Sequence, residues 1–486
     1  MAVGGLSGSA TIAILVLITG RVSAEPAPVE PADRADPMLL HSSDTLEVRA
    51  HFQAGFNLVA EDNLFWDLAA RAAGNTTFDP DGRWAEFFVE PGFSFQHRLN
   101  PEADFFGKLS AVASYTSGTD AFDASDTGRM TLEEAYLGYR TRFGDDWELE
   151  TSLGSQLLRL GTGMLIANGG ADGFERGALK FGPREAWEMA GLMQVSRDHF
   201  KTTAFYLEPN EMASNDTSNR LAGVDLRWDG DRGGYAGMSY LHVLESDAPY
   251  PQAAPGAEGA PAFLPGAREG LNTLNFYGRT EPTDGLVEGW GFGGDLAYQW
   301  NEDIDLRAWG GKIKAEYTFA DQPWSPVLGY SYQVFSGDDP TTGSLERFDP
   351  LYYDGSPSAW ATGSKSAMVF INSNVQSHNL SFRVTPTPRD IVTLRYAHVR
   401  AHELRSPVQF GQATRVDPSN GGIVVSGVTD AHLSDDFFLE YTRVINPNTY
   451  LTGGISISFP GDGITSAAGG AAPNWAGVFL NVVINY

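Results

Sequence analysis

Apolar and polar residues alternate along many short stretches of this chain, most clearly at its C-terminal end. In residues 477–486 every second position is apolar or aromatic: Val478, Leu480, Val482, Ile484 and Tyr486. Successive side chains of a β-strand point to opposite faces, so this stretch predicts a strand with one apolar and one mixed face. Such a strand suits a soluble sheet or the wall of a transmembrane β-barrel.

The connections between the predicted strands alternate between short and long. Before the last strand, alternating stretches predict strands at 450–459, 437–444, 391–400, 327–335 and 312–319. Short turns are expected at 446–448, 385–390 and 320–323, and long connections at 460–475, 401–432 and 336–378. Nearer the N-terminus, short turns at 99–104 and 143–146 flank a longer connection at 116–129. This alternation is typical of outer-membrane barrels, whose periplasmic turns are short and whose extracellular loops are long.

The fold class that we predict is all-β, a single large transmembrane antiparallel β-barrel with long extracellular loops. About 460 residues remain after removal of a signal peptide, and at roughly 25 residues per strand and connection they make about 18 strands. Strands between residues 160 and 270 are not individually assigned, and the Pro/Ala/Gly-rich stretch 249–265 is interpreted as a mobile loop. A soluble propeller or solenoid is the alternative, but no internal repeat of 20–50 residues supports it.

Composition agrees with a barrel in the bacterial outer membrane. The chain is 42% hydrophobic, yet its mean hydropathy is -0.23, and beyond the N-terminus it has no apolar run of the ~20 residues that a spanning helix needs. The apolar run at 11–19 and the small residues at 22–24 predict a signal peptide at 1–24. We expect a flexible N-terminal segment at 25–45 and the barrel at 46–486. Without cysteine, the chain has neither a disulfide nor a thiolate metal site.

Charge limits the possible partners. The formal net charge is -28, which argues against nucleic acid, because phosphate binding needs a basic surface. Outer-membrane lipid and lipopolysaccharide are the surroundings expected of the barrel. We expect the acidic excess to lie in loops, for instance at 145–146, 338–339 and 435–436.

The alternation also predicts which side chains face the lumen. If residues such as Leu137, Val224, Ile313, Phe382 and Leu394 face lipid, their neighbours point inward. The lumen candidates, which would form the substrate path, are Lys108, Glu134, Arg140, Asp225, Arg227, Lys312, Lys314, Glu316, Arg383 and Arg395. Cations interspersed with carboxylates suit an anionic, hydroxyl-rich polymer, because guanidinium groups bind carboxylates bidentately. The same pattern also fits the polar, ion-paired lumen of any wide barrel.

Several segments resemble the alginate export family of outer-membrane proteins. The main segments are Gly-Gly-Lys-Ile-Lys-Ala-Glu-Tyr-Thr-Phe at 310–319, Leu-Gly-Tyr-Ser-Tyr-Gln-Val-Phe-Ser-Gly-Asp-Asp at 328–339, and Glu-Arg-Phe-Asp-Pro-Leu-Tyr-Tyr at 346–353. The similarity continues at 372–374 and 392–397. Weaker similarity is present at 131–139 and 153–156. The resemblance implies a monomeric barrel of eighteen strands that carries polyuronate through an arginine-rich constriction. It makes Arg227, Lys314, Arg383 and Arg395 candidates for that constriction. Ser155 departs from the family pattern, in which we expect an arginine at this position. The loop 336–378 then either folds into the pore as a gate or covers its mouth.

Motifs for other chemistry lack the required context. Gly289 to Gly294 matches G-x-G-x-x-G, but the following residues predict a strand rather than a helix. His398 and His402 are four residues apart on a predicted strand that runs into a loop, and the sequence supplies no third metal ligand. Glu133 and Glu134 are adjacent in a strand, which places them on opposite faces. We therefore expect no cofactor, no metal site and no enzymatic activity.

The leading hypothesis is a channel for passive export of an anionic polysaccharide such as an alginate-like polyuronate, supplied by periplasmic polysaccharide-secretion proteins. A general or oligosaccharide-specific outer-membrane porin is the alternative. A third hypothesis is an outer-membrane enzyme, which would need a catalytic Ser/His pair in the loops.

Overall fold

The computed structural model describes residues 38–71, 77–258, 261–282, 287–355, 360–363, 370–410, 424–425 and 427–486. The predicted signal peptide, residues 1–24, lies outside this range. Among the described residues, no helix has the length and apolar character needed to cross a membrane.

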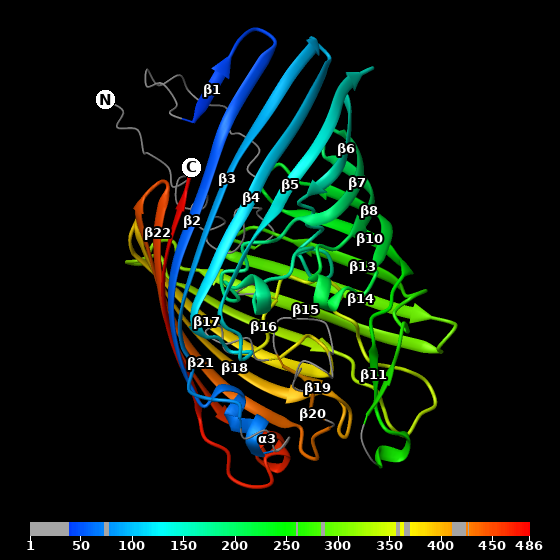
Figure 1. The fold of residues 1–486 in the computed structure, drawn as a ribbon, viewed down its shortest axis with the longest axis vertical. Coiled ribbons are helices and arrows are strands. Elements are labelled where there is room, and N and C mark those ends of the chain that lie inside the picture. Colours follow the sequence, from blue (N-terminus) through cyan, green and yellow to red (C-terminus); the bar gives the residue numbers. More distant parts are fainter. Residues whose placement is uncertain are drawn as a thin grey trace.

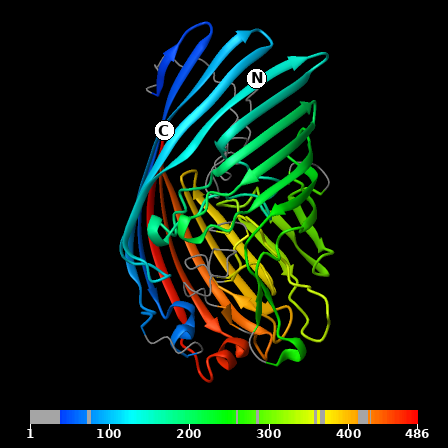
Figure 2. The same ribbon diagram turned by 45° about the vertical axis from the view of Figure 1, so that its right-hand side comes forward.

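Eighteen antiparallel strands form a closed barrel, as predicted (Figures 1 and 2). Each strand pairs with the next one along the chain, and the last pairs with the first. The strands are β2 (Leu46–Asp62), β3 (Arg83–Asn100), β4 (Ala103–Thr119), β5 (Ser125–Phe143), β6 (Trp147–Gln156), β7 (Trp187–Arg197), β8 (Phe200–Glu208), β9 (Arg220–Asp229), β10 (Tyr235–Glu245), β13 (Asn272–Arg279), β14 (Trp290–Asn301), β15 (Leu306–Thr318), β16 (Val327–Phe335), β17 (Val375–Thr387), β18 (Asp390–Ala401), β21 (His432–Asn446), β22 (Thr449–Pro460) and β23 (Trp475–Asn485).

The barrel closes where β23 pairs with β2. The register runs from Gln53 opposite Asn485 to Asp62 opposite Ala476. Beyond it, the amide of Phe52 donates to the carbonyl of Tyr486 at 3.0 Å, and the amide of Tyr486 donates back at 2.8 Å. The predicted terminal strand is therefore the one that completes the wall.

A short strand, β1 (Leu39–Ser42), continues this seam past the C-terminus. It pairs with β2 from Leu39 opposite Arg49 to Ser42 opposite Glu47. Part of the segment 25–45, predicted to be flexible, is therefore a strand. The backbone of β2 beyond Tyr486 supplies the ladder bonds that hold it.

Short turns and long connections lie at opposite ends of the barrel. Short turns join β3 to β4, β5 to β6, β7 to β8, β17 to β18 and β21 to β22. Connections with their own elements lie at the other end: η1 (Leu64–Asp67), α2 (Leu68–Arg71), η2 (Phe174–Arg176), η3 (Ala213–Asn215), η4 (Pro255–Ala257), β19 (Val408–Gln409), β20 (Val424–Val425) and α3 (Asp462–Ala467). In outer-membrane barrels the short-turn end faces the periplasm.

Three predicted connections are more ordered than expected. The connection 116–129 is mostly strand, because β4 and β5 are separated by residues 120–124 alone. The stretch 249–265, predicted to be a mobile loop, contains the paired strands β11 (Tyr250–Gln252) and β12 (Ala262–Leu264). Strand β17 continues through Pro386, where its register with β18 is irregular. Proline lacks an N–H, but a local irregularity lets the strand pass it.

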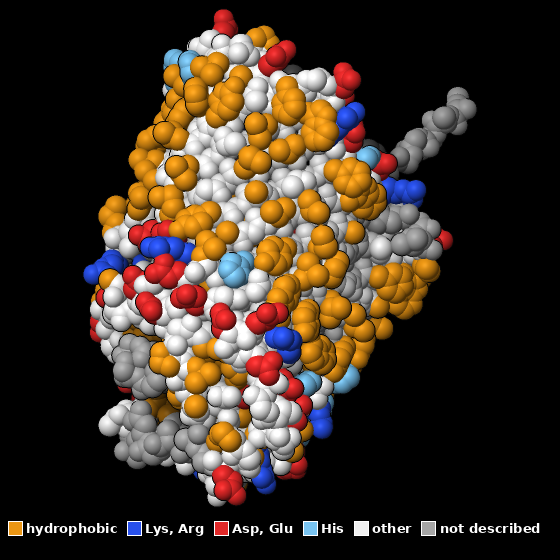
Figure 3. All heavy atoms as spheres, turned by 90° about the vertical axis from the view of Figure 1, so that its right-hand side faces the viewer, with side chains coloured by type: hydrophobic (Ala, Val, Ile, Leu, Met, Phe, Trp, Pro, Cys, Tyr) orange, Lys and Arg blue, Asp and Glu red, His pale blue; other side chains and the backbone are white. Residues whose placement is uncertain are grey.

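The outer surface of the wall is apolar, as the alternation predicts. Leu137, Leu153, Ile313 and Ile455 are each more than 60% exposed, and aromatic side chains lie beside them. Figure 3 shows apolar side chains spread over the wall, with charged ones most numerous in the lower half. Lipid tails are the solvent that suits such a surface.

We expect an introduced charge to destabilise the barrel strongly at one residue of β23 and only weakly at the adjacent residue. Leu480 is 47% exposed on the outer face, whereas Asn481 lines the lumen. Leu480→Lys should lower the free energy of unfolding by ~2–4 kcal/mol in a lipid bilayer. Asn481→Lys is the matched control and should cost far less in the same chemical denaturation. Equal losses in the two variants would contradict the assignment of the faces.

Candidate functional site

The barrel encloses one large cavity among the described residues that is open to the short-turn end. Its volume is about 2940 Å³, and its lining comes from strands on all sides and from two inward connections. We call residues 157–186, between β6 and β7, inner loop A. The described residues between β16 and β17, at 336–355, 360–363 and 370–374, are inner loop B.

Inner loop A is held to the wall by two buried glutamates. Glu86 of β3 accepts the amides of Lys180 and Phe181, each at 3.0 Å. Glu133 of β5 accepts the amides of Glu185 at 2.8 Å and Ala186 at 2.9 Å. Both glutamates are fully buried. Carboxylates that accept backbone N–H groups in this way satisfy amides that a loop inside a barrel could not otherwise pair.

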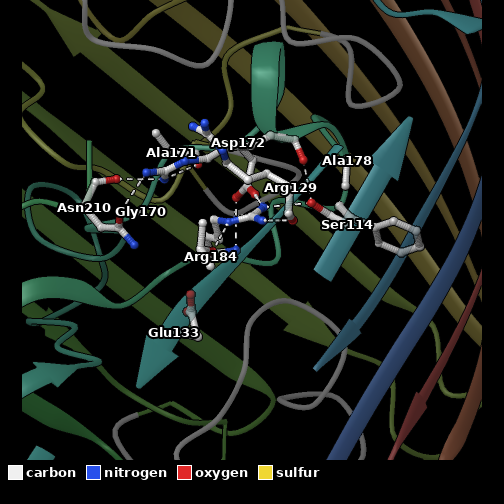
Figure 4. A network of polar contacts seen from close by, with 12 residues as sticks. Ser114, Arg129, Glu133, Gly170, Ala171, Asp172, Ala178, Arg184 and Asn210 are labelled. Atoms are coloured by element: carbon white, nitrogen blue, oxygen red, sulfur yellow. Dashed lines mark hydrogen bonds and ion pairs between the residues drawn. The ribbon is translucent and has the colours of Figure 1, made fainter. Parts of the chain in front are cut away.

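Arg184 is the centre of a further anchor (Figure 4). Its side chain is fully buried and pairs with Asp172 at 2.8 Å. It also donates to Ser114 Oγ at 2.9 Å and to the carbonyl of Arg129 at 2.8 Å, both on the wall. Burial raises the pKa of the Asp172 carboxyl to about 6, while the Arg184 guanidinium opposes that rise.

Inner loop B meets inner loop A inside the barrel. The amide of Tyr352 donates to the carbonyl of Leu165 at 2.9 Å, and the carbonyl of Tyr352 accepts the amide of Ala167 at 2.9 Å. A buried ion pair between Arg268 and Asp349, at 2.6 Å, fixes this loop to the connection that precedes β13. Because Tyr352 also lines the cavity, inner loop B enters the lumen rather than only covering its mouth.

Eight of the ten predicted lumen residues line this cavity, namely Lys108, Glu134, Arg227, Lys312, Lys314, Glu316, Arg383 and Arg395. The other two also lie on the inner side but are engaged by the wall. Asp225 accepts hydrogen bonds from Ser239 at 2.6 Å and Tyr277 at 2.9 Å. Arg140 pairs with Glu150 at 2.6 Å and lies over the ring of Phe106.

Most of these cations have a carboxylate partner. Lys108 pairs with Glu134, and the other distances are 2.7 Å for Arg227–Asp229, 2.8 Å for Lys314–Glu316 and 3.4 Å for Arg395–Glu440. Lys312 lies over the ring of Trp360 at 4.6 Å. Arg383 makes no ion pair within 4.0 Å to any residue that the structure describes.

On strands β8 to β18, six cations of the cavity lie close to the short-turn ends of their strands, and we call them the basic arc. Its members are Lys201 of β8, Arg227 of β9, Arg279 of β13, Lys314 of β15, Arg383 of β17 and Arg395 of β18. Each lies within five residues of a strand end that leads into a short or medium turn at the periplasmic side. Lys201 and Arg279 were not predicted, because the strands around them were not assigned from the sequence. Lys201 lies directly opposite Arg227 in the register of β8 and β9.

The cavity as a whole is not basic. Its described lining contains ten Lys and Arg but fifteen Asp and Glu, and carboxylates such as Asp229, Glu316 and Glu440 lie beside cations of the arc. The prediction that the acidic pairs lie in loops is wrong for residues 435–436, which belong to β21. Asp436 faces the lumen and Asp435 the outer surface, because alternation within a strand separates neighbours.

A β-bulge overturns the prediction for Glu133 and Glu134. Between Leu109–Ala111 of β4 and Leu132–Ala135 of β5 the register shifts by one residue. The two glutamates are therefore both buried, one accepting amides of inner loop A and the other pairing with Lys108. A bulge places an extra residue on one strand and so breaks the strict alternation of faces.

The departure at Ser155 also has a structural explanation. Its hydroxyl donates to the carbonyl of Glu133 at 2.6 Å and lies 3.0 Å from the carbonyl of Trp187. The residue is 8% exposed at the point where β6 ends and inner loop A begins. At this position the side chain therefore bonds to the neighbouring strands, and no cation is presented to the lumen.

His398 and His402, which are not predicted to be a metal-ligand pair, have different partners in the structure. His402 is turned toward Trp309, at 5.6 Å between ring centroids, and accepts the amide of Gly337. His398 instead lies beside His432 and Asp435, on the outer face of the barrel. His398 and His432 are 34 positions apart in the sequence, so their spacing did not indicate that they lie together.

Comparison with known proteins identifies one family. A family model described as alginate export matches residues 95–477. No curated protein is recognisably similar to the chain in sequence. Similar solved structures include OccK5 of Pseudomonas aeruginosa, with 8% identity, a TM-score of 0.48, and coverage of 90% of this chain and 98% of that one. OmpT of Vibrio cholerae has 10% identity, a TM-score of 0.38, and coverage of 92% and 99%. A porin of Rhodopseudomonas blastica has 8% identity, a TM-score of 0.36, and coverage of 90% and 100%.

We expect Arg184→Ala to destabilise the folded barrel, because it leaves Asp172 buried without its guanidinium partner. The loss should be ~3–5 kcal/mol in the free energy of unfolding, measured by guanidinium denaturation in detergent. The double variant Arg184→Ala, Asp172→Ala removes both charges and should recover part of that loss. A single variant as stable as the wild type would show that this ion pair does not anchor inner loop A.

Proposed function

The chain belongs to the alginate export family, and from this premise we propose that it is a passive outer-membrane channel for export of an anionic polysaccharide, an alginate-like polyuronate. The family is one of transport proteins, not of enzymes. A closed barrel with an apolar outer surface and a polar cavity is the architecture of a pore.

The basic arc is the observation that carries the choice of polymer. A polyuronate has a carboxylate on every sugar, and guanidinium groups bind carboxylates with two parallel hydrogen bonds. The arc presents cations from six strands to one cavity. Arg383 and Arg395 are its best candidates, because Arg383 makes no ion pair to a described residue and the Arg395–Glu440 pair is long at 3.4 Å.

The carboxylates that neighbour the arc suit transport rather than tight binding. Asp229, Glu316 and Glu440 each compete with a passing polymer for an arc cation. Each sugar carboxylate can therefore exchange with a protein carboxylate at little net change in ion pairing. A channel conducts when its ligand binds well enough to enter but weakly enough to leave.

The arc and the inner loops act in series along the passage. The arc lies near the short-turn end, which faces the periplasm, whereas inner loop A is anchored at Glu86 and Glu133, nearer the opposite strand ends. A polymer supplied from the periplasm meets the arc first. Periplasmic polysaccharide-secretion proteins are the partners that this direction requires, and we expect the barrel to work as a monomer.

The acidic surplus of the lining favours a second candidate, a general or oligosaccharide-specific porin. A lining with fifteen carboxylates and ten cations would not select for anions in general. Such a porin would pass small solutes and be indifferent to polyuronate.

Planar-bilayer recordings of the mature protein distinguish these two functions. Polymannuronate added on the periplasmic side should block the wild-type current. Arg383→Ala with Arg395→Ala should weaken the block by about tenfold or more, since each lost charge-assisted bond costs ~1.5 kcal/mol. Arg443→Ala is the matched control: it lies near the same turns but pairs with Asp390 and is 48% exposed. Block that is absent, or equal in all variants, would favour the porin.

A further inference from the structure

A histidine and aspartate cluster lies on the outer surface of the barrel, away from the lumen. His398 of β18 and Asp435 of β21 are directly opposite each other in the strand register, and His432 starts β21. Leu394 and Phe437, on the same faces of these strands, are 46% and 42% exposed. The cluster is therefore outward-facing, close to the end of the barrel that carries the long connections.

Asp435 holds the two imidazoles together. Its Oδ1 lies 2.8 Å from His398 Nδ1, and its Oδ2 lies 3.0 Å from His432 Nε2. The two rings stack at 4.8 Å with an angle of 30° between their planes. All the potential ligand atoms lie within 4.8 Å of one another. Tyr396 Oη donates to Asp435 Oδ1 at 2.6 Å, which orients the carboxylate.

We propose that His398, His432 and Asp435 form a binding site for a divalent transition-metal ion of the zinc type. Two imidazole nitrogens and one carboxylate are a ligand set that zinc accepts, with water completing the coordination. The ring nitrogens that now face Asp435 would offer lone pairs to the ion. Any proton that one of them carries moves to the other nitrogen of the same ring or leaves to solvent. The hydrogen bond from Tyr396 is of the kind that supports a metal-binding carboxylate.

The position of the site suggests what the ion does. His398 is three residues before the end of β18, and His432 is the first residue of β21, so the ion would join the two ends of the connection 402–431. Within that connection, Gln409 accepts a hydrogen bond from Arg347 of inner loop B. The ion would therefore stabilise a connection that also supports the lumen.

His378 provides a matched control on the same surface. It lies opposite His398 in the register of β17 and β18. Its Nδ1 is engaged by Tyr330 Oη at 2.8 Å, and its ring packs on Tyr332 at 4.8 Å. The two histidines are thus neighbours on one face, but only His398 belongs to the cluster.

Titration of Zn²⁺ into the untagged mature barrel, folded in detergent, tests the site by calorimetry. One ion should bind per barrel in the wild type and in His378→Gln. Affinity should fall more than tenfold in His398→Gln, His432→Gln and Asp435→Asn, and about tenfold in Tyr396→Phe. Absorption of Co²⁺ bound in place of Zn²⁺ gives a second readout that does not depend on stability. Absence of stoichiometric binding, or binding unchanged in Asp435→Asn, would overturn the proposal.

Discussion

The structure depends first on the need to pair every backbone N–H and C=O within the hydrocarbon layer. An unpaired backbone group there costs several kcal/mol, so a sheet in a membrane has to close. The seam between β2 and β23 meets this need over ten residue pairs, and Phe52 and Tyr486 extend it to the C-terminus. Once the sheet is closed, alternation gives each strand one face toward lipid and one toward the lumen. The apolar outer surface and the charged lining are thus two results of one constraint.

A second constraint acts on the chain inside the barrel. Where inner loops A and B pack against the inner walls, their polar groups are shielded from water and need partners. Glu86, Glu133 and Arg184 supply these partners for inner loop A, and the Arg268–Asp349 pair supplies them for inner loop B. Buried charges are therefore used mainly to position the loops. The less buried charges of the basic arc line the cavity.

The wall could be predicted from the sequence because its signal is local. Strand 327–335 was predicted with its observed bounds, and the predicted outward residues Ile313, Phe382 and Leu394 are exposed on the outer surface. The family resemblance is confirmed by the match over residues 95–477. Apolar and polar residues alternate wherever one face of a strand contacts lipid. This alternation can be recognised without knowing the distant segments of the chain.

The interior could be predicted only in part, because contacts between distant segments decide it. Inner loop A has no period that marks it as a lumen element, and its partners Glu86 and Ser114 lie on strands far away in the sequence. The bulge at Glu133 and Glu134 shifts the alternation of the two strand faces by one residue. The pattern of apolar and polar residues in the sequence does not reveal such a shift. His432 and Asp435 join His398 only through the pairing of β18 with β21.

Release of labelled oligosaccharides from liposomes that contain the purified barrel tests the central claim most directly. Oligomannuronate and a neutral glucan of the same length are enclosed together, and the two rates of release are compared. The account predicts that oligomannuronate leaves faster than the glucan and that the difference shrinks at high salt, which screens the basic arc. Equal rates, or faster release of the neutral glucan, would contradict it.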